Sequence, residues 1–190
     1  MPNWVTNKIS FYGEQKNIDK ILELIKGEET CIDFEKIIPM PEHIFRGNLG
    51  PDERKIYGKN NWYDWSNYHW GTKWNTYGGQ LIKEENEIYF DTAWSCPLPI
   101  LDKLAEMCYE HNVYFDGSWA DEDAGHNVGI FTSDCDSDEY WFSYEYITAE
   151  SNEAYEIYEE LKGESDCIGQ DEDGNYIHYD CDTCPNKDKC

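Results

Sequence analysis

The chain has 190 residues, enough for one well-buried domain and an additional segment. Tryptophan and tyrosine together supply 23 side chains, more than one core needs, so many of them are expected at the edge of the core or on the surface. The formal net charge is -25 at pH 7, and residues 96–190 hold 25 acidic but only 4 basic side chains. Repulsion by this charge excludes direct binding to nucleic-acid phosphates or to anionic membranes.

The sequence contains no apolar run near the roughly 18 residues that a membrane-spanning helix needs. Its first residues do not combine a basic region with an apolar stretch, so no secretory signal is predicted and a cytoplasmic protein is expected. Without such a signal, the eight cysteines are better interpreted as thiols or metal ligands than as disulfides.

The first half of the chain alternates short apolar patterns with turn residues. A strand is expected over residues 4–12, where β-branched and aromatic residues alternate with polar ones, and then a helix with apolar residues at 18, 21, 22 and 25 that ends near Gly27. Residues 32–41 are predicted to be extended, and residues 42–60 to form a loop with room for a short helical turn.

Aromatic residues are dense between positions 61 and 79. Trp62, Trp65 and His69 share one helical face, which predicts a short helix before Gly71 in which the histidine packs against Trp65. A hairpin is then expected over residues 79–94.

The second half repeats the pattern of helix and strands. Ser95 is a candidate N-cap for a helix with Pro97 in its first turn. Strands are predicted over residues 113–120, 128–132 and 140–147, and an amphipathic helix over about 150–162 that ends at Gly163.

The order strand, helix, strand, strand, helix, strand predicts an α+β, ferredoxin-like split βαβ fold: an antiparallel sheet with two helices on one face. A C-terminal helix and a small Cys-rich extension are added to it. The expected division is residues 1–148 for the ferredoxin-like domain and 149–190 for the acidic C-terminal helix and extension. Such folds carry many unrelated functions, so the fold alone predicts no activity.

Several short sequences resemble a family of phage and plasmid proteins, the YubB-type ferredoxin-like domain. They are Met1 to Trp4 with Asn7, residues 34–41 (FEKIIPMP), residues 70–75 (WGTKWN), residues 92–95 leading to Pro97, and Asp121-Glu122-Asp123 followed by Gly125, Asn127 and Gly129. The resemblance covers about residues 1–147. It implies a ferredoxin-like fold and an origin in a mobile element, but no established chemistry. The segment after Ser151 looks like an addition to the family pattern.

The C-terminal cysteines have the spacing of a metal site. Cys181 and Cys184 form a C-x2-C pair, and Cys167 and Cys190 complete a set of four thiolates, with His178 as an alternative ligand. Structural zinc is the favoured interpretation, because metal binding would stabilise a segment with few apolar residues around a hairpin turn at residues 173–174. An iron–sulfur cluster and four ordinary reduced thiols remain alternatives.

Two further groups of residues are candidate binding sites. Trp70, Lys73, Trp74, Asn75 and Trp94 could line a groove that stacks a base or grips a side chain, or the tryptophans could close one side of the sheet. Asp121, Glu122 and Asp123 could bind a hard cation through carboxylate oxygens, or form a solvated hairpin loop. The acidic run at Asp134, Asp136 and Asp138 lacks the glycine of an EF-hand and is expected to be a solvated loop as well.

The sequence favours binding over catalysis, because it contains no nucleophile elbow, no phosphate-cradling glycine loop and no H-E-x-x-H motif. The leading hypothesis is a non-enzymatic phage-type interaction protein that inhibits a host nucleic-acid-binding defence factor, of the anti-CRISPR or anti-restriction type, by presenting carboxylates where phosphates would lie. Its partner would be a host protein with a basic surface. The alternatives are a nucleotide-binding, sponge-like module using the Trp-rich segment, a metal-dependent enzyme built on Asp121 to Asp123, and acidity that serves only solubility. The oligomeric state is left open.

Overall fold

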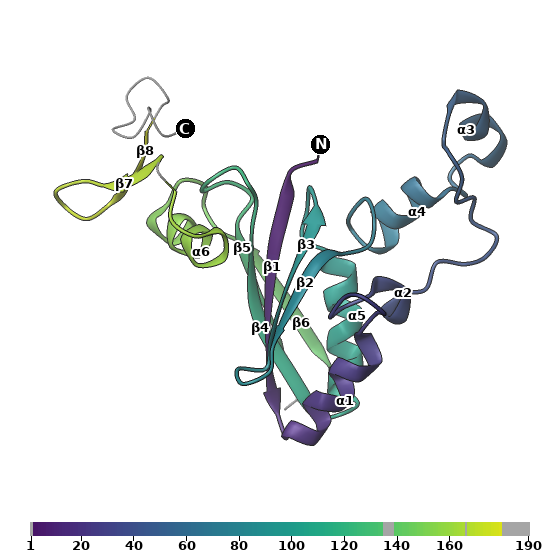
Figure 1. The fold of residues 1–190 in the computed structure, drawn as a ribbon, viewed down its shortest axis with the longest axis horizontal. Coiled ribbons are helices and arrows are strands. Elements are labelled where there is room, and N and C mark those ends of the chain that lie inside the picture. The colour runs from purple at the N-terminus through teal and green to yellow at the C-terminus, as the bar shows by residue number, and fades with distance from the viewer. Residues whose placement is uncertain (1, 135–138, 166, 180–190) are drawn as a thin grey trace.

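The computed structural model describes residues 2–134, 139–165 and 167–179. Six strands form one antiparallel sheet: β1 (Trp4–Gly13), β2 (Tyr77–Ile82), β3 (Glu87–Ala93), β4 (Val113–Ala120), β5 (Gly129–Asp134) and β6 (Trp141–Tyr146). Figure 1 labels these strands. Their order in the sheet is β2-β3-β1-β4-β5-β6. The first four strands have the arrangement of the split βαβ plan, and β5 and β6 extend the sheet beyond β4. The predicted α+β, ferredoxin-like fold is confirmed.

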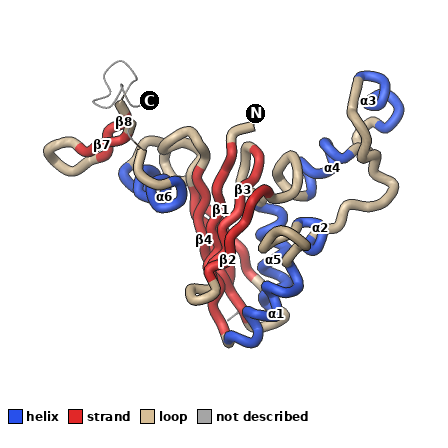
Figure 2. The backbone as a smooth tube through the Cα atoms, viewed as in Figure 1, coloured by secondary structure: helices blue, strands red, loops and turns tan. Residues whose placement is uncertain are grey.

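The two faces of the sheet differ because side chains alternate along each strand. On β1, Val5, Ile9 and Phe11 are buried on one face, whereas Thr6 and Lys8 point to the other. The first of these faces, called the helix face, is covered by α1 (Gln15–Ile25) and α5 (Leu98–Tyr109), which lie on the same side of the strands in Figure 2. The second is called the open face.

The main core lies between the helix face and these two helices. Helix α1 buries Ile18, Ile21, Leu22 and Ile25, the residues whose spacing predicted it. Helix α5 buries Ile100, Leu101, Leu104, Ala105 and Cys108. Both helices therefore follow directly from their apolar stripes.

Some local predictions are wrong. The segment predicted to be extended contains a short helix, α2 (Phe34–Ile37), because the Asp33 carboxylate caps it by accepting from the backbone N–H of Glu35 at 2.9 Å. Ser95 does not cap α5: the N-cap is Pro97, and the Ser95 hydroxyl instead donates to the carbonyl of Gly71.

The connection between α2 and β2 contains two more helices, α3 (Pro51–Tyr57) and α4 (Trp62–His69). Helix α4 is the short helix predicted before Gly71, and Asn61 caps it by accepting from the N–H of Asp64 at 3.0 Å. The rings of Trp65 and His69 stack at 4.5 Å, as the helical spacing predicted.

Helix α6 (Asn152–Lys162) lies on the opposite side of the sheet from α1 and α5, against β1 and β4 (Figure 1). Ser151 caps it, and Ala154 and Tyr155 are its buried residues. A two-stranded ribbon of β7 (Ile168–Gln170) and β8 (Tyr176–His178) follows, with Tyr155 and Tyr176 stacked at 5.6 Å. Helix α6 thus covers only part of the open face. No helix among the described residues is long and apolar enough to cross a membrane.

Candidate functional site

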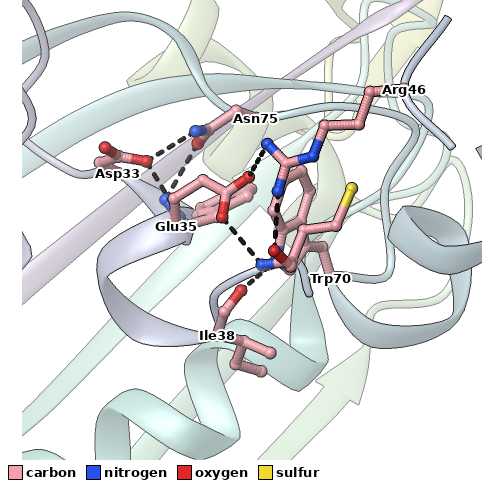
Figure 3. A network of polar contacts seen from close by, with 8 residues as sticks. Asp33, Glu35, Ile38, Arg46, Trp70 and Asn75 are labelled. Carbon is pink, nitrogen blue, oxygen red and sulfur yellow. Dashed lines mark hydrogen bonds and ion pairs between the residues drawn. The ribbon is translucent and has the colours of Figure 1, made fainter. Parts of the chain in front are cut away.

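Trp70 belongs to the core. Its side chain is 4% exposed, it packs edge-on against Phe34 and Trp65, and its indole N–H donates to the carbonyl of Ile38 at 2.8 Å (Figure 3). With its one donor satisfied by the backbone, this residue has no free group with which to bind a ligand.

Asn75 is a structural residue too. Its side-chain oxygen accepts from the backbone N–H of Phe34 at 2.9 Å, and its amide donates to the Asp33 carboxylate at 2.7 Å. Figure 3 shows these bonds beside the Glu35–Arg46 ion pair, whose closest atoms lie 3.4 Å apart. This network attaches the Trp-rich loop to α2 and so fixes the position of the residues around it.

Lys73, Trp74 and Trp94 do come together. The Lys73 ammonium nitrogen lies 4.3 Å from the centre of the Trp74 ring and 4.7 Å from that of Trp94. Trp4 extends the group, since it lies 6.3 Å from Trp74 and stacks on Tyr77 at 5.0 Å. We call these four rings with Lys73 the aromatic cluster. Cation–π attraction holds the lysine over the two indoles, so one face of each ring is already in use.

The backbone of Trp94 is strained, and neighbouring side chains hold it in place. Its φ of 70° is uncommon for an aromatic residue. Its N–H donates to the carbonyl of Asn3 at 3.0 Å, and its carbonyl accepts from the Asn127 amide at 3.1 Å. Asp121 joins the two asparagines, because its carboxylate accepts from Asn3 at 3.1 Å and from Asn127 at 2.9 Å.

Asp121 is therefore a buried structural acceptor, with a side chain that is 6% exposed. Glu122 is exposed, and the side chain of Asp123 is 65% exposed with its carboxylate 3.9 Å from a His126 nitrogen. The three acids thus do not converge on one point. Across the described residues, no group of three or more potential ligands is placed to hold a metal ion.

Most of the predicted zinc site lies outside the described residues. Cys181, Cys184 and Cys190 lie outside the described residues, as do Asp136 and Asp138 of the acidic run. Cys167 is half-buried just before β7, and its carbonyl accepts from the N–H of Tyr179, which closes the ribbon after β8. The ribbon turn is where residues 173–174 predicted it, whereas the metal remains a prediction.

A groove lies on the open face beside α6, and no sequence motif indicated it. Its volume is about 500 Å³. Carboxylates line it from three elements, namely Asp116 on β4, Glu145 on β6 and Glu160 on α6. Hydroxyl groups of Ser10, Ser118, Thr132 and Ser143 line it as well, with Ile130 and Ile157 as apolar neighbours.

Among the described residues that line the groove, Lys8 is the one lysine, and two carboxylates bind it. Its nitrogen lies 3.1 Å from a Glu87 oxygen and 2.8 Å from a Glu160 oxygen. Partial burial acts to lower the pKa of Lys8, but the hydrogen bonds to Glu160 and Glu87 outweigh it and raise that pKa. Burial likewise acts to raise the pKa of Glu87, and hydrogen bonds from Lys8, Tyr89 and Ser10 lower it overall.

The other lysine near the open face is also engaged. Lys162, at the end of α6, donates to the carbonyl of Trp4 at 2.8 Å. Burial lowers the pKa of Lys162, partly opposed by the charges of Asp91, Glu122 and Asp121. With both ammonium groups bound internally, the groove presents mainly acceptor oxygens, which suit a guest with N–H donors and positive charge.

These features define an α+β domain of the ferredoxin-like class, with helices on one face of its sheet and an acidic groove on the other. Residues 69–162 match the family model described as the ferredoxin-like domain in Api92-like protein. The match covers just under half of the chain and includes α5, α6 and five of the six strands of the main sheet. The match supports the ferredoxin-like part of the resemblance, and the description of the family model names no activity. A comparison with curated proteins found no match, and a comparison with solved structures found none either.

Proposed function

We propose that this protein is a non-enzymatic binding protein whose acidic half occupies a cationic surface of another protein. One observation carries the proposal. Residues 104–161 contain 16 acidic side chains and no lysine or arginine. The described part of this stretch includes β4, β5, β6, half of α5 and all of α6 except Lys162. The acids that line the groove, Asp116, Glu145 and Glu160, stand on three of these elements.

A negative field of this kind acts at long range. It accelerates the encounter with a basic surface and repels nucleic acid and other acidic proteins. The groove then offers a defined place for contact, since Asp116, Glu145 and Glu160 reach it from three different elements. A lysine or arginine side chain of the partner matches its charge and its acceptor oxygens.

The basic surface that we favour is one that normally holds nucleic acid. Carboxylates spaced over the surface of a folded protein can occupy the positions in which the target normally binds the phosphates of nucleic acid. In this proposal the protein originates from a phage or plasmid, as the YubB-type resemblance suggests, and acts in the host cytoplasm. Its target there is a nucleic-acid-binding defence factor of the CRISPR or restriction type.

The alternative of nucleotide binding by the Trp-rich segment has less support. Trp70 is in the core, Asn75 is bound to α2, and the Lys73 ammonium covers one face of both Trp74 and Trp94. A metal-dependent reaction at Asp121 has less support for a similar reason, because both of its oxygens already accept hydrogen bonds that hold the loop.

The test uses two variants with the same net charge. The groove variant carries Asp116→Asn, Glu145→Gln and Glu160→Gln. The control variant carries Glu28→Gln, Glu29→Gln and Glu42→Gln, three exposed positions outside the groove. Each protein and the wild type are used to capture partners from a nuclease-treated host lysate, and any captured protein is then tested for binding to its nucleic acid.

The proposal predicts that the wild type and the control variant capture the same basic protein and displace its nucleic acid. The groove variant should bind that protein with an affinity at least about tenfold lower, which corresponds to about 1.4 kcal/mol or more of binding free energy. Recovery of no protein, with a nucleotide co-purifying, would contradict it. Equal capture by both variants would also contradict it, because net charge alone would then explain binding.

A further inference from the structure

Within the described part of the chain, the edge strand β6 pairs with one strand, β5. It pairs with β5 in an antiparallel register from Gly129↔Tyr146 to Asp134↔Trp141, and it is the last strand in the sheet order. Among the described residues, none pairs with its outer edge. An edge of this kind presents unused backbone N–H and C=O groups to any strand that can lie beside it.

The opposite edge of the sheet is protected. The pairing of β2 with β3 shifts between Tyr77 and Gln80, which is a bulge at the edge. At this bulge Gly78 has a φ of 65°, and its carbonyl accepts from the Thr30 hydroxyl at 3.1 Å. Irregular backbone and a covering loop are two ways in which proteins prevent strand addition. Strand β6 has neither among the described residues.

The direction of the free groups on β6 follows from one hydrogen bond. The N–H of Ile147 donates to the carbonyl of Val128 at 3.0 Å, so this residue faces β5. Because successive residues of an antiparallel strand alternate in direction, the backbone groups of Phe142, Tyr144 and Tyr146 face away from β5. These three residues would make the hydrogen bonds to an added strand.

The same three residues form a row of rings on the helix face. Phe142 packs against Phe131 at 6.5 Å, and Tyr144 lies 6.2 Å from Phe142 and 6.1 Å from Tyr146. Tyr144 is 49% exposed and Tyr146 is 57% exposed. Half-exposed tyrosines next to an open edge offer apolar contact to alternate side chains of an incoming strand.

We propose that β6 binds an extended, basic segment of the partner protein as a seventh strand of the sheet. This inference rests on the proposed function and names the part of the molecule that makes the main-chain contact. Charge decides between the possible occupants. A second copy of this chain would bring together two molecules of net charge -25, whereas a lysine- or arginine-rich strand is attracted by the acidic stretch that contains β6.

The probe for this inference is a short peptide of alternating lysine and valine, about six residues long, the usual length of a strand. A peptide of alternating glutamate and valine is the matched control for charge. Amide hydrogen exchange of the full chain, followed by NMR, reports which backbone N–H groups the peptide protects. We expect protection of the amides of Phe142, Tyr144 and Tyr146 by the lysine peptide and by it alone.

Two substitutions at one position test the strand geometry. Tyr144→Pro removes an N–H that β5 does not use, and Tyr144→Lys places a positive charge on the edge while leaving the backbone intact. Each substitution is expected to lower the affinity of the protein for the lysine peptide by about tenfold or more. Tyr68→Lys is the matched control, because Tyr68 is 79% exposed on α4, away from this edge, and that variant should bind like the wild type.

The outcomes separate this inference from the proposed function. If the lysine peptide binds but protects no β6 amide, strand addition is wrong while binding of cationic guests stands. If neither peptide binds, both proposals fail. If the protein alone forms a dimer that protects the same three amides, the occupant of the edge is a second copy and the inference is overturned.

Discussion

Replacement of Lys8 by methionine should have opposite effects on stability and on binding. The Lys8→Met change keeps a long unbranched side chain but removes the charge that Glu87 and Glu160 share. Within the fold it breaks two ion pairs. Within the groove it leaves the carboxylates without their internal cation.

The cost in stability follows from the exposure of the partners. The side chains of Lys8 and Glu87 are 18% and 13% exposed, so their pair is poorly screened, whereas Glu160 is 53% exposed. A charged hydrogen bond contributes about 1.5–3 kcal/mol when shielded and about 0–1 kcal/mol at the surface. Because Ser10 and Tyr89 still donate to Glu87, we expect Lys8→Met to lower the free energy of unfolding by about 2 kcal/mol. Glu160→Gln should lower it by less than about 1 kcal/mol.

The gain in binding follows from Coulomb's law. Removal of one positive charge about 6 Å from a cationic guest in water is worth about 0.7 kcal/mol, or about threefold in affinity. Urea denaturation measures the first effect, and calorimetric titration with a lysine-rich peptide measures the second. Unchanged stability, or weaker binding of the peptide, would show that Lys8 is not the counter-ion that we describe.

Other predictions concern the loop around Asp121, two glycines, and the dependence of stability on acidic pH. Asp121→Ala should lower the free energy of unfolding by about 1–3 kcal/mol in thermal denaturation, because it removes a buried carboxylate that accepts hydrogen bonds from the Asn3 and Asn127 amides. This loss of stability should be the same with and without added metal. Gly117→Ala should prevent folding as judged by circular dichroism, since a Cβ there would collide with the Lys8 carbonyl and the Phe131 ring. Gly58→Ala has open space around it and should cost only about 1–3 kcal/mol, for a backbone with φ 54° and ψ -124° that residues other than glycine rarely adopt. The pKa of Glu87 lies below its ordinary value near 4.5, so its contribution is present above that pH and is lost as the pH falls through the lowered pKa. Urea denaturation at a series of acidic pH values should therefore show a shallower loss of stability for Glu87→Gln than for the wild type.

The sheet and its two covering helices could be predicted because their periodicity is strong. Alternation along β1 and the stripe on α1 each separate buried from exposed residues without any tertiary information. Helix α2 could not be predicted in this way. It has only four residues, and it depends on a cap by Asp33 and on the bond from Phe34 to Asn75, which lies 41 positions away in sequence.

The candidate site was predictable only in part, for a physical reason. The sequence shows that tryptophans are dense but not which of them find a partner for the indole N–H, so Trp70 in the core and Trp94 at the surface look alike. The groove was missed because its lining combines β1, β4, β5, β6 and α6. The one signal was the excess of acidic residues after position 96, which gave the charge of the surface but not its shape.

The most direct test of the account is a calorimetric titration of three proteins with the same lysine-rich peptide, at low and at high salt. The wild type and the control variant should bind it equally well, with an affinity that falls as salt screens the charges, and the groove variant should bind at least about tenfold more weakly. Equal affinities for the groove variant and the control variant would contradict the claim that the groove carboxylates are the binding surface.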